Sequence, residues 1–281
     1  MHIIEQVQEM QRWSEIQRHR GERIVFVPTM GFLHDAHLSL VRDGKKRGDR
    51  VVVSIFVNPA QFNPNEDFAA YPRDFERDRG LLEREPVDVL FHPPVREIYP
   101  EGYQTHVNVD KLSRLLCGAH RAGHFQGVAT VVAKLFNIVR PHAAIFGEKD
   151  YQQLQVIRRL VRDLNFDIEI VGYPIVRETD GLAMSSRNAY LSCQERQAAV
   201  CLSRSLSRGA CVVKRGEAQA RIVTQAVRAE IAREPLARLE YVSFCDSATL
   251  EEIEEIRDSA LLALAVWIGK TRLIDNTILQ R

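Results

Sequence analysis

The 281-residue sequence predicts an α/β protein with a doubly wound parallel sheet and a second, smaller α+β domain. Through the first 174 residues, short apolar runs rich in β-branched residues alternate with segments of helical periodicity, which is typical of right-handed βαβ units. The alternation stops after Gly172, where helical segments precede strands. We therefore predict one domain over residues 1–174 and a second over residues 175–281.

The elements of the first domain follow from their apolar spacing. Ile3, Ile4, Val7, Met10 and Trp13 recur at helical spacing and predict an N-terminal helix. Strands are predicted at residues 24–27, 50–57, 87–91, 143–146 and 167–171, with helices at 38–46, 73–85, 126–139 and 150–164. Strands separated by helices of this length imply a parallel sheet with helices on both faces.

The second domain begins with a long polar stretch over residues 174–191. Helices are then predicted at 194–213 and 217–233, and strands at 239–244 and 261–268. This order indicates a separate α+β unit instead of a continuation of the first sheet.

The composition argues against several kinds of partner. Lysine and arginine total 38 and aspartate and glutamate total 37, so the formal charge is +1, and no long basic run is present. We expect no binding to nucleic acid or to an anionic membrane. The five cysteines form no Cys-x-x-Cys pair and indicate reduced thiols in a cytoplasmic protein. The N-terminus does not read as a signal peptide, and the longest apolar run, residues 260–268, is too short to span a bilayer.

The most informative segment is residues 28–37, where an apolar strand gives way to a helix that carries His34 and His37. The first N–H groups of a helix lack partners, and the helix dipole adds positive charge, so an anion is favoured there. Neutral histidines at that position can donate hydrogen bonds to a phosphate. The spacing alone leaves open a solvated surface pair and a metal site.

Three further loops are rich in polar groups: residues 58–62, 147–153 and 184–188. Each has an ordinary interpretation, as a turn, a helix cap or a plain loop. Ligands of an open parallel sheet bind at the carboxyl ends of its strands, and three of the four loops follow strands. Lys149 and Arg187 supply cations for a leaving pyrophosphate, and Gln61 and Gln153 supply amides for a small polar acid. Together the four loops indicate attack on the α-phosphate of a nucleotide.

The chain resembles the pantoate–β-alanine ligases, members of the nucleotidylyltransferase superfamily, whose His-x-Gly-His signature is shared with class I aminoacyl-tRNA synthetases. The resemblance runs nearly end to end and rests on several motifs in order: Pro28-Thr29-Met30-Gly31, Phe56-Val57-Asn58-Pro59 with Gln61-Phe62, Tyr71-Pro72-Arg73, Gly123-His124-Phe125, Phe146-Gly147-Glu148-Lys149-Asp150, Ser185-Ser186-Arg187-Asn188 and Thr271-Arg272-Leu273-Ile274-Asp275-Asn276. It implies a Rossmann-like sheet of the class I nucleotidylyltransferase type, with the second domain acting as a lid.

The resemblance also implies the reaction. The carboxylate of pantoate attacks the α-phosphorus of ATP to give pantoyl adenylate and pyrophosphate. The amine of β-alanine then attacks the acyl carbon, which gives pantothenate and AMP. Mg²⁺ is expected to accompany the triphosphate, although the sequence does not identify its ligands. A homodimer is a further expectation from the family.

The resemblance assigns roles residue by residue. The ATP-binding loop is Met30, Gly31, Phe32, Leu33, His34, Asp35, Ala36 and His37, with His37 as the catalytic proton donor and His34 on the phosphates. The other nucleotide contacts are Gly147, Glu148, Lys149, Asp150, Val176, Met184, Ser185, Ser186 and Arg187, of which Lys149 and Arg187 act on the phosphates. Gln61 and Gln153, with Asn58 beside them, match the pantoate positions, and Gln61 is shared with β-alanine.

Three positions depart from the family pattern. Ala36 replaces the glycine of His-x-Gly-His and adds a methyl group where the nucleotide approaches the backbone. Ala122 replaces a common proline, and Phe32 is bulkier than expected. Two other functions stay open: an adenylyltransferase that transfers AMP to a phosphorylated acceptor, and a metal-binding module that uses His34 and His37 as ligands.

Overall fold

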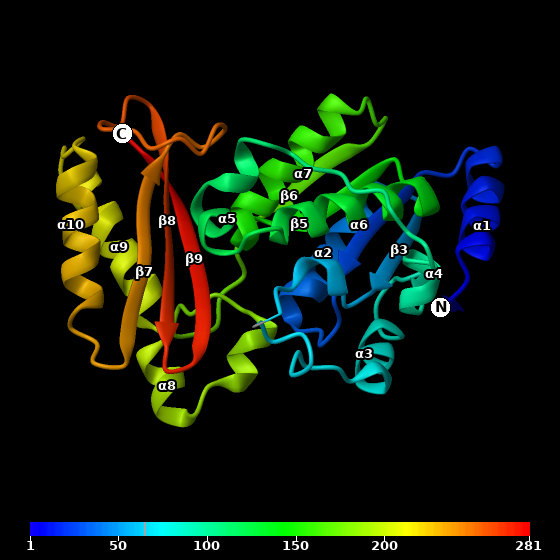
Figure 1. Ribbon diagram of the computed structural model, residues 1–281, viewed down its shortest axis with the longest axis horizontal. Coiled ribbons are helices and arrows are strands. Elements are labelled where there is room, and N and C mark those ends of the chain that lie inside the picture. Colours follow the sequence, from blue (N-terminus) through cyan, green and yellow to red (C-terminus); the bar gives the residue numbers. More distant parts are fainter. Residues whose placement is uncertain (65) are drawn as a thin grey trace. The chain divides into compact units, whose positions relative to one another are not determined.

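The computed structural model describes residues 1–64 and 66–281, which form two compact units. Unit 1 comprises Met1–Ser113, Arg121–Glu148 and Gln153–Pro174, and unit 2 comprises Arg114–His120, Lys149–Gln152 and Ile175–Arg281. Unit 1 holds a six-stranded parallel sheet and unit 2 a three-stranded antiparallel sheet (Figure 1). The predicted fold class is confirmed, whereas the division at residue 174 and the lid role stay predictions.

The sheet of unit 1 has the strand order β1-β4-β3-β2-β5-β6. Its strands are β1 (His2–Ile4), β2 (Ile24–Thr29), β3 (Arg50–Ile55), β4 (Val89–Phe91), β5 (Ala143–Gly147) and β6 (Glu169–Tyr173), and all pairings are parallel. From β2 the chain proceeds outward to β3 and β4, and from β5 it proceeds the opposite way to β6. The topological switch point, where such sheets bind ligands, therefore lies between β2 and β5.

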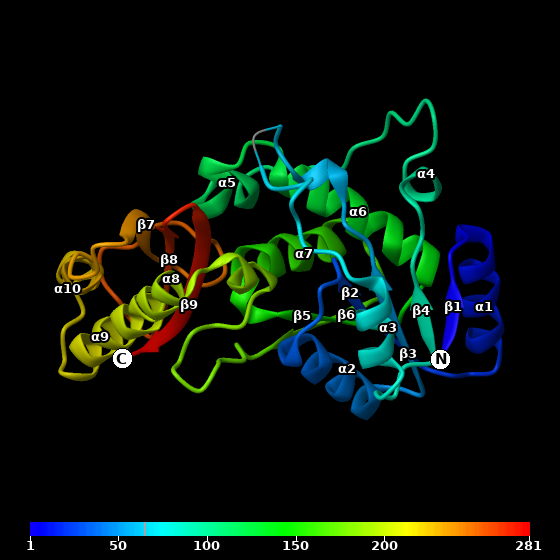
Figure 2. The ribbon, with the colours of Figure 1, turned by 90° about the horizontal axis from the view of Figure 1, so that it is seen from below.

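Helices cover both faces of this sheet. The long helices are α1 (Val7–His19), α2 (Asp35–Arg47), α3 (Phe75–Leu82), α6 (His124–Val139) and α7 (Tyr151–Asp163), with a short α4 (Val95–Ile98). Figure 2 shows α2 and α3 on one face and α6 and α7 on the other. Right-handed crossovers require this division, because α2 and α3 connect strands in one direction across the sheet and α7 connects them in the other.

The core of unit 1 is built on β2 and β3. Val25, Val27, Val51 and Val53 are fully buried, and α2 packs Val41 against them. A strand covered on both faces must be apolar along its length, which explains the β-branched runs that predicted these strands. Among the described residues, no helix is long and apolar enough to cross a membrane.

Unit 2 is an antiparallel meander with helices on one face. Its strands are β7 (Ala237–Cys245), β8 (Ser259–Ile268) and β9 (Thr271–Gln280), in the order β7-β8-β9. The helices α9 (Cys201–Lys214) and α10 (Ala220–Ile231) pack on this sheet and are preceded by α8 (Cys193–Ala198). A separate segment, α5 (Leu116–His120), contacts Tyr241 of β7 through Cys117, whose Sγ lies 3.1 Å from the phenol oxygen.

Two predicted elements are wrong and one strand was missed. Ile3 and Ile4 belong to β1, not to a helix, because the chain start pairs with β4 before α1 begins at Val7. The helix predicted at 194–213 is two helices, α8 and α9. The strand β9 was not predicted, since its run of polar residues hides the apolar alternation. Short 3₁₀ turns in the described part of the chain are Pro59–Gln61, Leu112–Arg114, Glu148–Asp150 and Ser186–Tyr190.

Candidate active site

The two histidines lie at the start of α2, directly after β2. His34 is the N-cap residue, with an extended backbone, and His37 is the third residue of the helix. The backbone N–H of His34 donates to Nδ1 of His37 at 3.3 Å, and the two ring centroids are 4.0 Å apart. Because Nδ1 of His37 accepts a hydrogen bond, the proton of the neutral ring is on Nε2. The structure therefore gives His37 a donor at Nε2.

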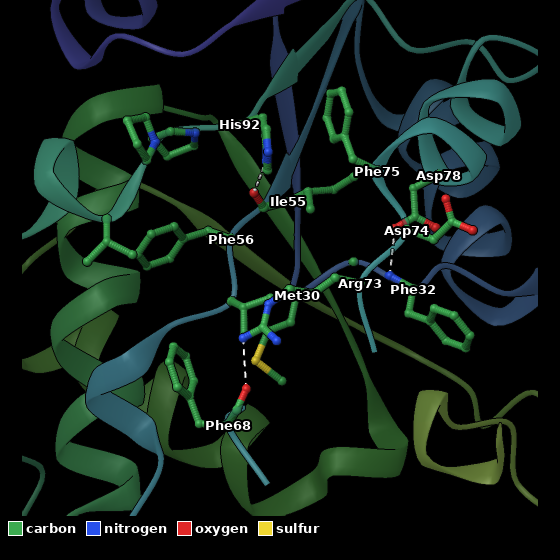
Figure 3. Close-up of a pocket in the computed structure, with 15 residues that line it drawn as sticks. Met30, Phe32, Ile55, Phe56, Phe68, Arg73, Asp74, Phe75, Asp78 and His92 are labelled. Carbon is green, nitrogen blue, oxygen red and sulfur yellow. Dashed lines mark hydrogen bonds between the residues drawn. The ribbon is translucent and has the colours of Figure 1, made fainter. Parts of the chain in front are cut away.

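The loop before α2 has an unusual backbone. Gly31 and Phe32 have positive φ angles of 81° and 50°, a region that costs a non-glycine residue free energy. Oδ2 of Asp78 on α3 accepts a hydrogen bond from Phe32 N at 2.6 Å (Figure 3), and Oδ1 accepts one from Leu33 N at 2.8 Å. Arg77 donates to the carbonyl of Leu33 at 2.9 Å, and its guanidinium lies 5.0 Å from the Phe32 ring centroid. These contacts explain how the loop accommodates the bulky side chain of Phe32.

Asp78 is a site residue that the sequence reasoning missed. Its side chain is 1% exposed, and burial raises its pKa although the N–H donors of Leu33 and Phe32 oppose that shift. A signal for it exists in the sequence. Asp78 is four residues before the buried Leu82, so an acid occupies the apolar face of a helix. An aspartate at such a position needs a buried partner, here the backbone N–H groups of Phe32 and Leu33.

Two of the three amides predicted for pantoate, Asn58 and Gln61, meet in the loop after β3. Asn58 Nδ2 donates to Gln61 Oε1 at 3.1 Å, and Gln61 Nε2 lies 2.9 Å from the sulfur of Met30. The phenol of Tyr99 donates to Asn58 Oδ1 at 2.8 Å. Burial raises the pKa of Tyr99, which keeps the phenol protonated as a donor. The structure thus joins three predicted residues, Asn58, Gln61 and Met30, and adds Tyr99 behind them.

The backbone of Gln61 is held from the side of α6. Arg121 can only donate, so His124 accepts at Nε2, 3.0 Å away, and donates from Nδ1 to the Gln61 carbonyl at 2.8 Å. Arg121 Nε also donates to Glu66 at 2.9 Å. Burial acts to raise the pKa of Glu66, but the hydrogen bond and charge of Arg121 outweigh it, and the pKa is lowered. This network fixes the loop around Ala122 although the family's proline is absent.

A cavity of about 330 Å³ lies between the loop of residues 30–32, the end of β3 and the start of α3 (Figure 3). Most of its lining is apolar, and its polar side chains have protein partners. Arg73 donates to the carbonyl of Tyr71 at 2.9 Å, and His92 Nδ1 donates to the carbonyl of Ile55 at 2.9 Å. Met30 lines this cavity and also contacts Gln61.

The other predicted residues of unit 1 follow β5. Gly147 is the last residue of β5, the strand next to β2 at the switch point, and Glu148 comes directly after it. A Cβ on Gly172 of β6 would lie 2.9 Å from the carboxylate of Glu148, so a glycine leaves room for that side chain. Gln153 lies in the first turn of α7 and is partly buried.

The remaining residues that were predicted to contact the nucleotide belong to unit 2. Lys149 Nζ lies 3.8 Å from Asp150 Oδ1. Met184 N donates to the carbonyl of Val176 at 3.0 Å, which joins two predicted contacts. Ser185 caps the 3₁₀ turn that contains Ser186 and Arg187, and its hydroxyl accepts from Arg187 N at 3.3 Å. Within the described part of the chain, no three His, Cys, Asp or Glu side chains gather as metal ligands, so nothing there favours the metal-binding alternative.

A doubly wound sheet with a histidine pair at a helix start by its switch point defines the class: a Rossmann-like α/β enzyme with an anion-binding loop. The family described as pantoate-beta-alanine ligase matches residues 2–278. A protein of Geobacter sulfurreducens called pantothenate synthetase is 56% identical over 99% of both chains, and one of Thermotoga petrophila is 54% identical over 99% of this chain and all of its own. The chain belongs to the pantoate–β-alanine ligase family.

Solved structures agree with this assignment. The pantothenate synthetase of Thermus thermophilus superposes with a TM-score of 0.94 at 46% identity, over 99% of both chains. The pantoate–β-alanine ligase of Francisella tularensis, described as a complex with β,γ-ATP and β-alanine, gives a TM-score of 0.79 at 34% identity over 99% of this chain and 97% of its own. The reaction is therefore the joining of pantoate to β-alanine to form pantothenate, and the adenylyltransferase alternative is not favoured.

Proposed function

We propose that the reaction proceeds in two steps at the loops described above. In the first, a carboxylate oxygen of pantoate attacks the α-phosphorus of ATP, the bond to the pyrophosphate oxygen breaks, and pantoyl adenylate forms. In the second, the nitrogen of β-alanine attacks the acyl carbon, the bond to the AMP oxygen breaks, and the amine loses a proton. Adenylation is required because a carboxylate itself is a poor acylating agent.

The observation that carries this proposal is the position of His34 and His37. Both lie at the N-terminus of a 13-residue helix, where N–H groups and the helix dipole favour phosphate. The Nε2–H of His37 donates to a phosphoryl oxygen as charge develops on the leaving pyrophosphate, so its main role is electrostatic. Asp35, Ala36 and the backbone of Met30–Leu33 complete the ATP-binding loop.

The proposed role of Lys149 and Arg187 is to balance the charge of the phosphates. Gly147 and Glu148 contact the nucleotide, Val176 packs beside adenine through its backbone, and Met184, Ser185 and Ser186 bind phosphate. Mg²⁺ screens the triphosphate when it is bound. The 49%-exposed carboxylate of Asp150 fits such an ion, because Mg²⁺ is usually held by one or two carboxylates and the substrate's phosphates.

Pantoate is proposed to bind Gln61 and Gln153, with Gln61 shared with β-alanine. The Gln61 amide is 7% exposed and oriented by Asn58 and Met30, so it offers a preorganised neutral hydrogen-bonding group. A neutral amide suits this role, since it orients a carboxylate without lowering its nucleophilicity by ion pairing. We further propose a homodimer located in the cytoplasm.

Two measurements test the pathway. Pyrophosphate should exchange into ATP when pantoate alone is present, and the complete reaction should release AMP. Release of ADP would contradict the proposal. The variant His37→Ala should lose the exchange while remaining folded, because His37 lies at a partly exposed helix start. The matched control is His19→Ala on the exposed end of α1, which should keep full exchange. Normal exchange in His37→Ala would refute the role of His37.

A further inference from the structure

The strand β9 carries two consecutive polar residues that are almost completely buried. Asp275 is 2% exposed and Asn276 is 5% exposed. They pair in register with Leu264 and Ala263 of β8, and successive side chains of a strand point to opposite faces of the sheet. Buried polar side chains need hydrogen-bonding partners, and these two find them in the segments proposed above to bind the nucleotide.

Asp275 holds the segment that leads to Ser185–Arg187. Its carboxylate binds Arg177 in a bidentate pair, with N···O distances of 2.7 and 2.9 Å. Arg177 also donates to the carbonyl of Gly181 at 3.0 Å and forms an antiparallel bridge with Ala183. The turn between Val176 and Met184 is therefore closed by its own backbone and tied to β9 by the ion pair of Arg177 with the buried Asp275, which is a geometrically specific contact.

Asn276 holds the backbone of Lys149. Its Nδ2 donates to the carbonyl of Lys149 at 2.9 Å, and its own backbone N–H donates to Asp275 Oδ1 at 2.8 Å. The carboxylate of Asp275 thus connects Arg177 to the residue that anchors Lys149. Two chain segments that are distant in the sequence are fixed to adjacent positions of one strand.

We propose that Asp275 and Asn276 are positioning residues of the adenylation step. They fix the position of the Lys149 backbone relative to residues 176–187. The Lys149 amine and the polar groups of Ser185–Arg187 can then bind the triphosphate at the same time. Prearranged cations and donors stabilise the transition state without reorganisation. This inference rests on the nucleotide roles proposed for Lys149 and residues 184–187. Neither Asp275 nor Asn276 contacts substrate itself.

The test separates the two half-reactions. The variants Asn276→Ala and Arg177→Lys are compared with wild type in pantoate-dependent pyrophosphate exchange and in acyl transfer from separately supplied pantoyl adenylate to β-alanine. Arg177→Lys keeps the charge but loses the bidentate geometry, so it is the milder change. We expect exchange to fall about tenfold with a raised KM for ATP, the equivalent of one lost hydrogen bond. Acyl transfer should stay within about twofold, since pyrophosphate has already left.

A double-mutant cycle identifies the route of the effect. If Asn276 acts through Lys149, adding Asn276→Ala to Lys149→Ala should cause no further loss of exchange. If the losses of exchange in the two single variants multiply in the double variant, the inference is overturned. An equal loss of exchange and of acyl transfer in Asn276→Ala would also overturn it, because a folding defect lowers both half-reactions equally. Normal exchange in Lys149→Ala would overturn it as well. A wild-type enzyme without pantoate-dependent exchange would instead contradict the proposed pathway.

A matched control separates positioning from stability. Ser243 on β7 is 8% exposed and donates to Glu252 at 3.2 Å, so Ser243→Ala also removes a buried hydrogen bond from the same sheet. We expect Ser243→Ala to lower the thermal unfolding midpoint while both half-reactions stay at wild-type rates. A loss of exchange in Ser243→Ala equal to that in Asn276→Ala would refute the positioning role.

Discussion

Replacing Asp78 by asparagine tests how the ATP-binding loop is held. The carboxylate accepts two short hydrogen bonds, from Phe32 N and Leu33 N, in a place where it is 1% exposed. Asparagine is nearly the same size but has only one acceptor oxygen, so one of the two N–H groups would face an amide N–H₂. The variant therefore changes the hydrogen bonding of the loop and leaves its packing almost unaltered.

The magnitude follows from the two contacts. A hydrogen bond to a charged group contributes about 1.5–3 kcal/mol, and a buried N–H without an acceptor costs about 1–3 kcal/mol. We expect the variant to weaken the loop conformation by about 2–4 kcal/mol, so that the remaining contacts no longer offset the cost of holding Phe32 at positive φ. If the loss is about 2 kcal/mol and appears in full as weaker binding of the transition state, kcat/KM for ATP falls about thirtyfold.

The assay is pantoate-dependent pyrophosphate exchange at varied ATP, with thermal unfolding measured in parallel. Asp74→Asn is the control, because Asp74 lies on the same side of α3 but only caps the helix, accepting from Arg77 N at 3.1 Å, and asparagine caps equally well. A folded Asp78→Asn enzyme with kcat/KM for ATP within about twofold of wild type would refute the reasoning. Equal losses in both variants would show that charge matters and the hydrogen bonds do not.

Three further predictions concern the loops around the site. Gly127→Ala places a Cβ 2.2 Å from the Ala60 carbonyl oxygen, so it should lower the free energy of unfolding by about 1–3 kcal/mol and raise KM for pantoate. The control Gly80→Ala has open space around its Cβ and should change neither quantity. Glu66→Gln should lower the unfolding midpoint at pH 7. Because the folded-state pKa of Glu66 is lowered from 4.5, its stabilisation is present above pH 4.5 and declines as the pH falls through the folded-state pKa. A difference in unfolding midpoint between the two proteins that did not shrink as the pH was lowered below 4.5 would contradict this. Ala36→Gly should lower KM for ATP while costing about 0.5–1 kcal/mol in α2, and an unchanged KM would show that the extra methyl group does not meet the nucleotide.

The buried strands of unit 1 could be predicted because their physical constraint is visible in the residues themselves. A strand covered on both faces must be apolar throughout, as β2 and β3 are. The strand β9 obeys another constraint, since Asp275 and Asn276 are buried by virtue of their partners and not their hydrophobicity. Ile3 and Ile4 were assigned to a helix for a different reason: two apolar residues fit a helical and an extended periodicity equally well, so their pattern does not distinguish α1 from β1.

In the candidate site too, local features could be predicted from the sequence and long-range contacts could not. His34 and His37 could be found because they follow a strand and begin a helix, which are local features. Asp78 left only an indirect signal, an acid four residues before Leu82 on one helix face, because its partner is a loop 45 residues earlier in the chain. Tyr99 is similar, since only the folded chain brings its phenol to Asn58. Residues that bind the substrate leave local patterns, whereas residues that orient them are selected by distant contacts.

Unit 2 is assembled from three separated stretches of the chain, and this has a consequence for synthesis on the ribosome. The strands of unit 1 are all present once Tyr173 has emerged. Residues 114–120 and 149–152 emerge early but have partners that are made much later: Tyr241 follows Cys117 by 124 residues, and Asn276 follows Lys149 by 127 residues. Until the C-terminal sheet is completed, these two stretches lack their partners on β7 and β9. A nascent chain released before β9 would therefore contain a finished parallel sheet and two exposed segments, which makes it a specific target for chaperones or proteases.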